Sequence, residues 1–347
     1  MKNINILVFM LMLVMITCKN SKKDEIEKFQ KKRDNIINVK GKINDLKTEL
    51  VFGYSSLYIC DNLLIVMEMA PGGNKGIHLY DKNTFEYITS SAIIGKGPGE
   101  VARQGGIGFD SKDRVLWVSD HGKKLIWKFP LDSILNNEMY KPTEKINLFD
   151  ELFIEKYGFV NDSIAIGKAV RIHPNYSFDK VMAKLNINNN VTEEYGYEHP
   201  EATAKKSISV FKLSTENNFY VNCYFYCDLM TICDLEGNLK KNIYGPGWLK
   251  NKDNRNAYFT EVDLYNKYII AAYLGDESII FNENKRPQSN LPSKFLVFDL
   301  DGEYQKTIDT GHKIAYFCID SENKRLIAYF DDRENPLGYI DLQEILN

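Results

Sequence analysis

Histidine and cysteine, the side chains that most protein zinc sites use, are scarce in this chain. Five histidines and six cysteines occur among 347 residues, with no CxxC pair, no HExxH motif and no histidines at metal-ligand spacing. A zinc site is therefore not expected. The sequence also lacks a Gly-x-Ser-x-Gly elbow, so a serine hydrolase of that type would have no nucleophile.

An excess of charge of either sign is missing as well. Lysine and arginine number 44 and aspartate and glutamate 47, which gives a net charge of −3. A nucleic-acid-binding protein needs a basic face that neutralises phosphates, so no nucleic-acid partner is expected. Long segments with helical periodicity are also rare. Aromatic residues, by contrast, make up 12% of the chain, and this enrichment favours strands.

The N-terminus has the pattern of an export signal. Lys2 precedes an apolar stretch from Ile4 to Ile16, which is shorter than the roughly 20 residues of a membrane span and typical of a signal-peptide core. We therefore predict a signal peptide over residues 1–17. The polar segment that follows, residues 18–43, is predicted to be a tether.

Cys18 stands at the junction between the apolar stretch and this polar segment. The layout resembles a bacterial lipoprotein lipobox, and the resemblance implies that Cys18 carries a lipid. Thr17 and Met15 differ from the usual lipobox residues. An ordinary signal peptide followed by an incidental cysteine is the alternative interpretation.

An internal repeat predicts the architecture of the rest of the chain. A short polar turn followed by three apolar residues occurs six times, at intervals of 48 to 57 residues. The six triplets are Leu64-Ile65-Val66, Leu116-Trp117-Val118, Ile164-Ala165-Ile166, Phe219-Tyr220-Val221, Ile269-Ile270-Ala271 and Leu326-Ile327-Ala328. Further apolar runs follow each triplet, several of them closed by Asp.

Four short strands in each repeat of about 50 residues, repeated six times, predict an all-β fold, a six-bladed β-propeller with four-stranded antiparallel blades. We assign residues 44–347 to this domain. The last blade ends with its third strand near Ile340, while an apolar segment, residues 46–52, precedes the first blade. We therefore predict that the N-terminal strand closes the last blade.

One segment between two predicted blades, Ile94-Gly95-Lys96-Gly97-Pro98-Gly99-Glu100, has the glycines and proline of a tight turn. This GKGPGE motif, the following Gly108-Phe109-Asp110 and the leader together resemble the TolB-like or NHL-like six-bladed propeller lipoproteins of the Bacteroidetes. The resemblance implies a fold and a cell-envelope location. It supplies no catalytic residues, because that family is largely uncharacterised.

In such a ring, the tight turns lie on one face and the longer loops on the other, around the channel mouth. Long polar loops on a rigid scaffold are where binding usually occurs. Three loops could bring charged groups together there to bind a polar or anionic ligand. The candidate ligand-binding residues are Asp120, His121, Arg171, His173, Asp331 and Arg333, with Tyr224 and Tyr226 near the same rim.

These features predict a cell-envelope lipoprotein, periplasmic or surface-exposed and attached to the outer membrane through its lipid. Its propeller would be a binding or scaffolding module for an envelope protein, a peptide or a glycan. The alternative is a metal-assisted propeller hydrolase, a lactonase or carbohydrate-active enzyme. No catalytic residue, metal ligand or cofactor is assigned; calcium would suit a carboxylate-rich propeller, but nothing in the sequence supports it. A non-enzymatic role is favoured.

Overall fold

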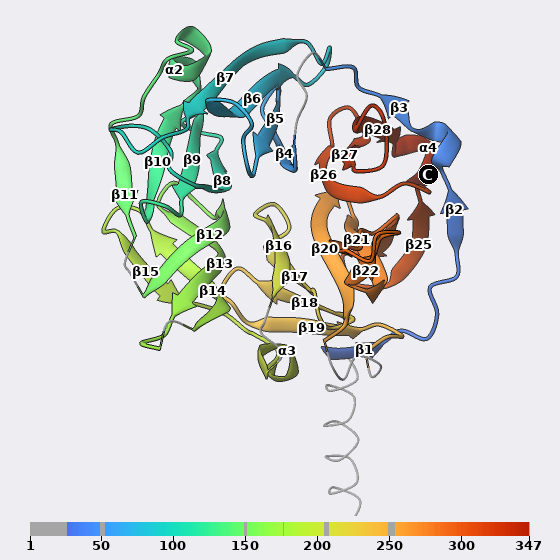
Figure 1. The fold of residues 1–347 in the computed structure, drawn as a ribbon. Coiled ribbons are helices and arrows are strands. Elements are labelled where there is room, and N and C mark those ends of the chain that lie inside the picture. The colour runs from blue at the N-terminus through green and yellow to red at the C-terminus, as the bar shows by residue number, and fades with distance from the viewer. Residues whose placement is uncertain are drawn as a thin grey trace, which may run out of the picture.

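The computed structural model describes residues 26–48, 53–148, 151–175, 177–204, 208–248 and 254–346. In this part of the chain, six antiparallel sheets surround a central axis like the blades of a propeller, and the chain runs around the ring in sequence order (Figure 1). The predicted six-bladed β-propeller is confirmed.

Blades 1 to 3 are formed by consecutive strands, the first of each being the innermost. Blade 1 contains β4 (Ser55–Cys60), β5 (Leu63–Glu68), β6 (Lys75–Asp81) and β7 (Tyr87–Ile93). Blade 2 contains β8 (Gln104–Asp110), β9 (Val115–Asp120), β10 (Leu125–Pro130) and β11 (Lys145–Asn147), with α2 (Leu131–Asn136) between the last two. Blade 3 contains β12 (Leu152–Phe159), β13 (Ile164–Ile172), β14 (Phe178–Asn186) and β15 (Val191–Glu194).

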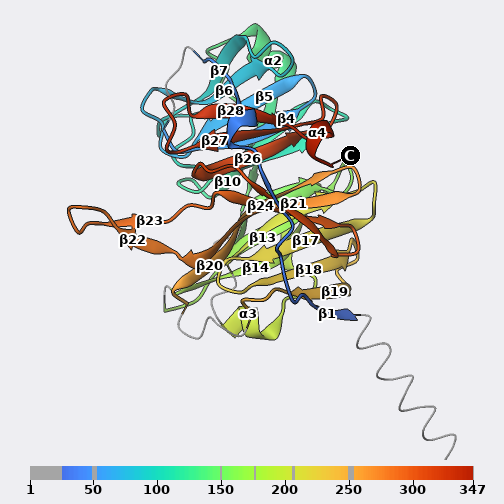
Figure 2. The same ribbon diagram turned by 90° about the vertical axis from the view of Figure 1, so that its right-hand side faces the viewer.

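Blades 4 to 6 complete the ring. Blade 4, which follows α3 (Pro200–Ala204), contains β16 (Ser209–Ser214), β17 (Phe219–Tyr224), β18 (Leu229–Asp234) and β19 (Leu239–Tyr244). Blade 5 contains β20 (Asn256–Tyr265), β21 (Tyr268–Glu277), β24 (Lys294–Asp299) and β25 (Tyr304–Asp309), and a hairpin of β22 (Ile279–Phe281) and β23 (Pro287–Ser289) projects from it (Figure 2). Blade 6 contains β26 (Ile314–Asp320), β27 (Arg325–Phe330) and β28 (Leu337–Asp341), and α4 (Gln343–Leu346) follows it.

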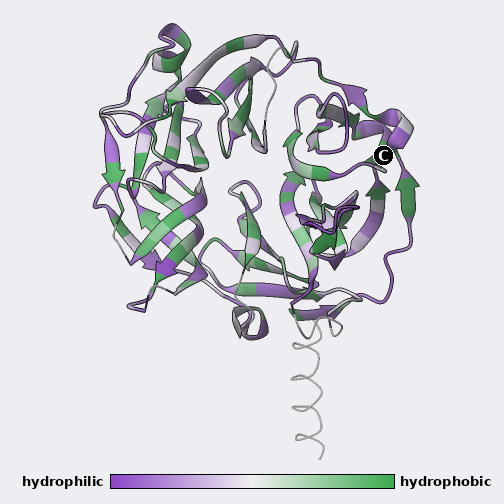
Figure 3. Ribbon diagram, viewed as in Figure 1, coloured by the Kyte–Doolittle hydropathy of each residue, from purple (hydrophilic) through white to green (hydrophobic). Residues whose placement is uncertain are grey.

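The six apolar triplets are the second strands of the six blades. Each second strand lies inside its sheet, and both faces of the sheet pack against neighbouring blades. Nearly all of the triplet side chains are buried, including Ile65, Val221 and Ile270 at 0% exposure. This position explains why the triplets are continuously apolar. Along many other strands, hydrophobic and hydrophilic stretches alternate (Figure 3).

The aspartates that close several third strands organise the turns that follow. Asp299 Oδ1 accepts hydrogen bonds from the backbone N–H groups of Asp301 (3.0 Å) and Glu303 (2.9 Å), and Asp234 makes the same kind of turn. Gly237 and Gly302 have positive φ angles of 88° and 79°, which glycine adopts without strain. The segments that follow Asp234 and Asp299 therefore form the same kind of turn.

The N-terminal segment closes the ring as predicted. Strand β3 (Asn44–Asp45) pairs antiparallel with β28 and becomes the fourth strand of blade 6. Leu46 N donates to Leu337 O at 2.9 Å, and an ion pair between Arg333 and Asp45 holds the junction. The closing strand is shorter than expected and lies just before the apolar segment, of which residues 49–52 are outside the described residues.

The polar segment expected to be a tether is instead part of the ring from Ile26 onward. We call residues 26–45 the belt. Its strand β1 (Glu27–Phe29) adds in parallel to β19, and β2 (Ile36–Asn38) adds in parallel to β25, so blades 4 and 5 each gain a fifth strand. The 3-10 turn η1 (Lys40–Lys42) then leads to β3. Figure 2 shows the belt, in blue, crossing the outside of the ring.

Arg33, between β1 and β2, anchors the belt by a buried ion pair. Its Nη1 lies 2.8 Å from Asp228 Oδ1, and the side chains are only 7% and 0% exposed. Asp228 Oδ2 also accepts hydrogen bonds from Gly247 N (2.8 Å) and the Tyr273 hydroxyl (3.1 Å). The guanidinium lies 5.0 Å from the Tyr273 ring centroid, close enough for a cation–π contact.

Replacing Arg33 by Ala should destabilise the fold strongly, because it leaves the Asp228 carboxylate buried without its cation. Breaking a buried pair in this way costs about 3–5 kcal/mol. The measurement is chemical denaturation of Arg33→Ala beside Lys32→Ala, whose side chain is 79% exposed. Equal stability of the two variants would contradict an anchoring role for Arg33.

Candidate ligand site in the central channel

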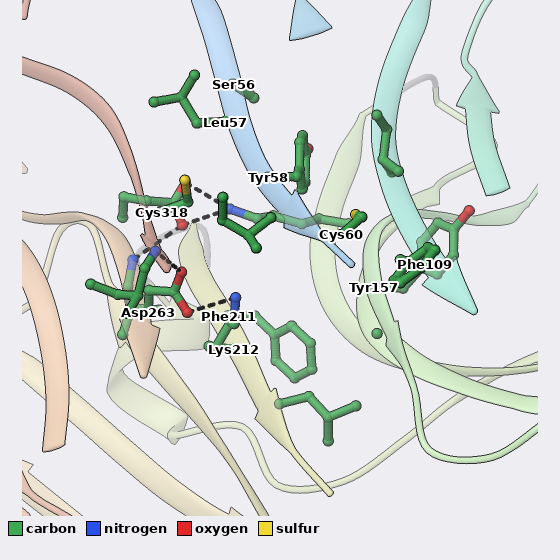
Figure 4. Close-up of a pocket in the computed structure, with 18 of the residues that line it drawn as sticks. Ser56, Leu57, Tyr58, Cys60, Phe109, Tyr157, Phe211, Lys212, Asp263 and Cys318 are labelled. Atoms are coloured by element: carbon green, nitrogen blue, oxygen red, sulfur yellow. Dashed lines mark hydrogen bonds and ion pairs between the residues drawn. The ribbon is translucent and has the colours of Figure 1, made fainter. Parts of the chain in front are cut away.

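The six innermost strands surround a cavity of about 280 Å³ on the axis of the ring. Each of the strands β4, β8, β12, β16, β20 and β26 contributes side chains, among them tyrosines, phenylalanines, two thiols and two Lys–carboxylate pairs (Figure 4). The lining extends to Phe159 and Thr215, next to the tight turns. The strands thus assemble one cavity from residues that lie far apart in the sequence.

The first charged pair joins Lys156 of blade 3 to Glu261 of blade 5. Lys156 Nζ lies 2.7 Å from both carboxylate oxygens, and the carboxylate is the more buried partner at 9% exposure against 35%. Burial by itself would lower the pKa of Lys156, but the Glu261 carboxylate outweighs it and raises the pKa. The ammonium group therefore remains charged in the channel.

The second pair joins Lys212 of blade 4 to Asp263 of blade 5. Lys212 Nζ lies 2.6 Å from Asp263 Oδ1, and Oδ2 accepts a hydrogen bond from Ile319 N at 2.9 Å. Burial would lower the pKa of Lys212, and the neighbouring Asp263 raises it overall. The Lys212 side chain is 43% exposed and the Asp263 side chain 8%, so the carboxylate is again the more buried partner.

Hydroxyl and thiol groups complete the polar lining. Burial raises the pKa of Tyr58 and Tyr157, so both phenols remain neutral hydrogen-bonding groups. Burial also raises the pKa of the Cys60 thiol to about 12 and that of Cys318 well above its usual value. Both cysteines are free and buried. Because the thiolate is the nucleophilic form, these two thiols are unreactive at neutral pH.

Asp120 and His121, predicted to bind a ligand, have structural contacts at the end of β9. The Asp120 carboxylate is 1% exposed and accepts hydrogen bonds from four backbone N–H groups and the Trp127 indole. His121 packs edge-on against Phe153 with ring centroids 5.5 Å apart, and burial lowers its pKa. The pair therefore organises the start of the loop between β9 and β10.

Arg171 and His173 meet at one carboxylate. Asp179 Oδ2 lies 3.0 Å from Arg171 Nη2 and 2.8 Å from His173 Nε2, and Arg171 also pairs with Glu194. Arg171 belongs to β13 rather than to a long loop, because that strand continues to Ile172. These contacts connect strands within blade 3.

The remaining candidates also have local partners. Tyr224 is buried, and its hydroxyl donates to Glu198 Oε2 at 3.2 Å; Tyr226 packs edge-on against Phe225. Arg333 holds the closing strand, and the backbone N–H of Asp331 donates to Lys313 O at 2.9 Å. Ligand binding by these eight residues stays a prediction, whereas their structural contacts are clear.

Sequence reasoning missed the four charged channel residues. Lys156, Lys212, Glu261 and Asp263 lie on the first strands of blades 3, 4 and 5, shortly before the tight turns. A charged residue within an otherwise apolar or aromatic first strand is the signal that could have identified them. Only the ring closure, however, determines which lysine meets which carboxylate.

A hydrogen-bonded line of side chains crosses blade 1 as well. Glu68 Oε2 lies 3.2 Å from His78 Nε2, His78 Nδ1 lies 2.8 Å from Ser90 Oγ, and Ser90 Oγ lies 2.8 Å from the Tyr87 hydroxyl. Ser90 is 7% exposed and His78 8%. The line therefore satisfies buried polar groups across three adjacent strands and offers a substrate little access to the serine.

Metal-binding clusters and membrane-spanning helices are both missing from the part of the chain that the structure describes. No group of three or more His, Cys, Asp and Glu side chains is placed there to hold a metal ion. No helix in the same ranges has the length and hydropathy to span a membrane.

Comparison with known proteins shows the family and supports the fold. The family model described as "TolB-like 6-blade propeller-like" matches residues 54–322. Among solved structures, a member of the DUF4221 family from Bacteroides vulgatus ATCC 8482 superposes with a TM-score of 0.59 at 12% identity, over 86% of this chain and 95% of the other.

A "Putative exported protein" from Bacteroides fragilis NCTC 9343 is also similar in structure. It superposes with a TM-score of 0.52 at 12% identity, over 91% of this chain and 98% of the other. At this level of identity, both similarities concern the fold alone. No curated protein matches the sequence significantly.

Acidification should destabilise the fold before the carboxylates titrate. Burial lowers the pKa of His78, His121 and His199 in the folded state below the usual value of about 6.5. The unfolded chain then binds more protons, so stability is full above about pH 6.5 and falls as the pH drops below it. Urea denaturation at pH 7.5 and 5.5 measures the decrease in the free energy of unfolding between these two pH values. His121→Asn should make this decrease smaller. An unchanged pH dependence in that variant would argue against a contribution from His121.

Proposed function

Because the chain belongs to the TolB-like six-blade propeller family, we propose that it is an exported binding module that holds a small polar ligand in its central channel. The observation that carries this proposal is the presence of two channel-lining lysines, each paired with a carboxylate that is more buried than the lysine side chain. Such preorganised donors bind a ligand without first paying the entropy of their own ordering.

The composition of the channel lining indicates the ligand's chemistry. Its charged residues are Lys156, Lys212, Glu261 and Asp263, so the formal charges cancel. Phenol hydroxyls and aromatic rings provide hydrogen bonds and apolar faces beside them. A neutral molecule rich in hydroxyl or amide groups, such as a saccharide or a short peptide, suits this lining. The volume of about 280 Å³ is near the lower end for small-molecule pockets.

The location that we propose is the cell envelope, with a lipid on Cys18 as the anchor. The leader pattern of residues 1–17 supports export, and a structurally similar propeller bears the description of an exported protein. Residues 1–25 lie outside the described residues, so this part of the proposal depends on the sequence. The partner would be an envelope protein, a peptide or a glycan.

A double substitution that removes one charged pair tests the channel. Lys156→Met/Glu261→Gln should keep the fold, because replacing both members of a buried pair by neutral residues of similar size is often tolerated. It should also weaken ligand binding about tenfold or more. The measurement is a thermal-shift screen of neutral mono- and disaccharides and dipeptides, followed by calorimetric titration of each compound that stabilises the wild type.

The matched control is Lys241→Met/Asp301→Asn, which removes an ion pair on the outside of blades 4 and 5. It should bind as the wild type does. If no compound in the screen stabilises the protein, or if both double variants lose binding equally, the channel is not the ligand site.

Substitution of Cys18 tests the anchor. Wild-type protein expressed in a bacterial host with lipoprotein processing should sediment with membranes and incorporate labelled palmitate, whereas Cys18→Ser should do neither. Cys60→Ala, which removes a buried thiol instead, should still sediment. Membrane association and labelling that persist in Cys18→Ser would show that the anchor lies elsewhere.

A further inference from the structure

The GKGPGE motif forms a rigid connector between blades 1 and 2. Gly97 N donates to Glu100 Oε2 at 2.8 Å, and Gly95 N donates to Val101 O at 3.0 Å. Gly99 has a φ of +67°, and a Cβ there would lie 2.7 Å from Lys141 Cβ. Only glycine fits at this position, so the connector packs closely against the segment that leads into β11.

A groove of about 660 Å³ lies between this connector and that segment. Its apolar residues are Pro98, Leu125, Trp127 and Pro142. Four lysines also line the groove, and no acidic residue does: Lys96, Lys123, Lys141 and Lys145. The groove therefore combines an apolar lining with a concentration of positive charge, in a chain whose net charge is −3.

The partners of these lysines leave most of the charge uncompensated. Lys123 Nζ donates to the carbonyl oxygens of Gly97 (2.7 Å) and Glu100 (2.6 Å), which fix its position but carry no formal charge. Lys145 Nζ lies 5.7 Å from the Trp127 ring centroid, and Lys123 Nζ lies 5.4 Å from it. Lys141 pairs with the Glu100 carboxylate at 2.8 Å.

Four ammonium groups surround the groove, and Glu100, beside it, pairs with one of them. The buried Asp120 carboxylate lies behind the lining, where it accepts hydrogen bonds from the Trp127 indole and the Lys123 backbone N–H. The lysines still outnumber these two carboxylates by two. Lys123 and Lys141 contact the connector, Lys145 lies near the indole, and Lys96 is part of the connector itself. An anion that enters the groove would meet several donors at once, in a region of positive potential.

We propose that this groove binds the carboxylate or sulfate groups of an acidic glycan. Charge-assisted hydrogen bonds from the lysines would hold the anionic groups. The apolar lining would contact the faces of the sugar rings. This site is separate from the channel, whose formal charges cancel, and the proposal does not depend on the channel's ligand.

The test uses chondroitin sulfate oligosaccharides as the probe and neutral maltohexaose as its uncharged counterpart. The wild type should bind the sulfated probe more weakly as salt is raised, because ions screen the contacts. Lys96→Gln/Lys145→Gln should weaken binding about tenfold. The matched variant Lys240→Gln/Lys267→Gln, which removes two exposed lysines of blades 4 and 5, should bind within about twofold of the wild type.

Several outcomes would overturn the proposal. Equal weakening in the two double variants would show diffuse attraction by the whole surface. Binding of maltohexaose that Lys96→Gln/Lys145→Gln weakens as much as binding of the sulfated probe would show that the groove does not recognise anionic groups. Binding to phosphatidylglycerol vesicles without binding to the sulfated probe would show a membrane-facing surface instead. The channel variant Lys156→Met/Glu261→Gln should bind the sulfated probe normally, which separates this test from that of the channel.

Discussion

The structure depends on the closure of the ring. A four-stranded blade has two apolar faces, and a single blade in water would leave both exposed. Packing each blade between two neighbours covers these faces, and the second strands, such as the one around Ile65 and Val66, become fully buried. The chain achieves closure by pairing β3, from its N-terminal part, with β28, from its C-terminal part. The two ends of the domain therefore stabilise one blade together.

Closure also creates the candidate site. The inner strands do not pair with one another around the axis, so their channel-facing side chains interact across the gap. Lys156 of blade 3 reaches Glu261 of blade 5, past the strand of blade 4 that carries Lys212. In both pairs the carboxylate side chain is more buried than the lysine side chain, and the pairing fixes the position of each ammonium donor. A rigid ring with fixed donors suits binding better than it suits large conformational change.

The belt connects the proposed anchor to this ring. Its composition is that of a solvated linker, yet three of its short strands extend blades 4, 5 and 6. The two parallel additions are only three residues long, so the backbone pairing alone is modest. Arg33 adds a buried charge pair with Asp228, surrounded by Tyr273, Phe259 and Phe298. A pull on the N-terminus would therefore act on the outer edge of the ring rather than on a loose tail.

The sequence by itself determined the number of blades, the position of each buried second strand and the closure, because these follow from local turn chemistry and from apolar triplets repeated about every 50 residues. It also indicated an export leader over residues 1–17, directly before Cys18. It did not determine the partners of polar residues. Asp120, His121 and Arg171 suggested a loop site, but each has partners close by. Nothing in the sequence indicated which carboxylates pair with Arg33 and Lys156, since each carboxylate lies more than 100 positions away along the chain. Only the tertiary structure decided which of these charged residues form ion pairs. Long-range pairing of charges depends on how the ring closes and leaves no local pattern in the chain.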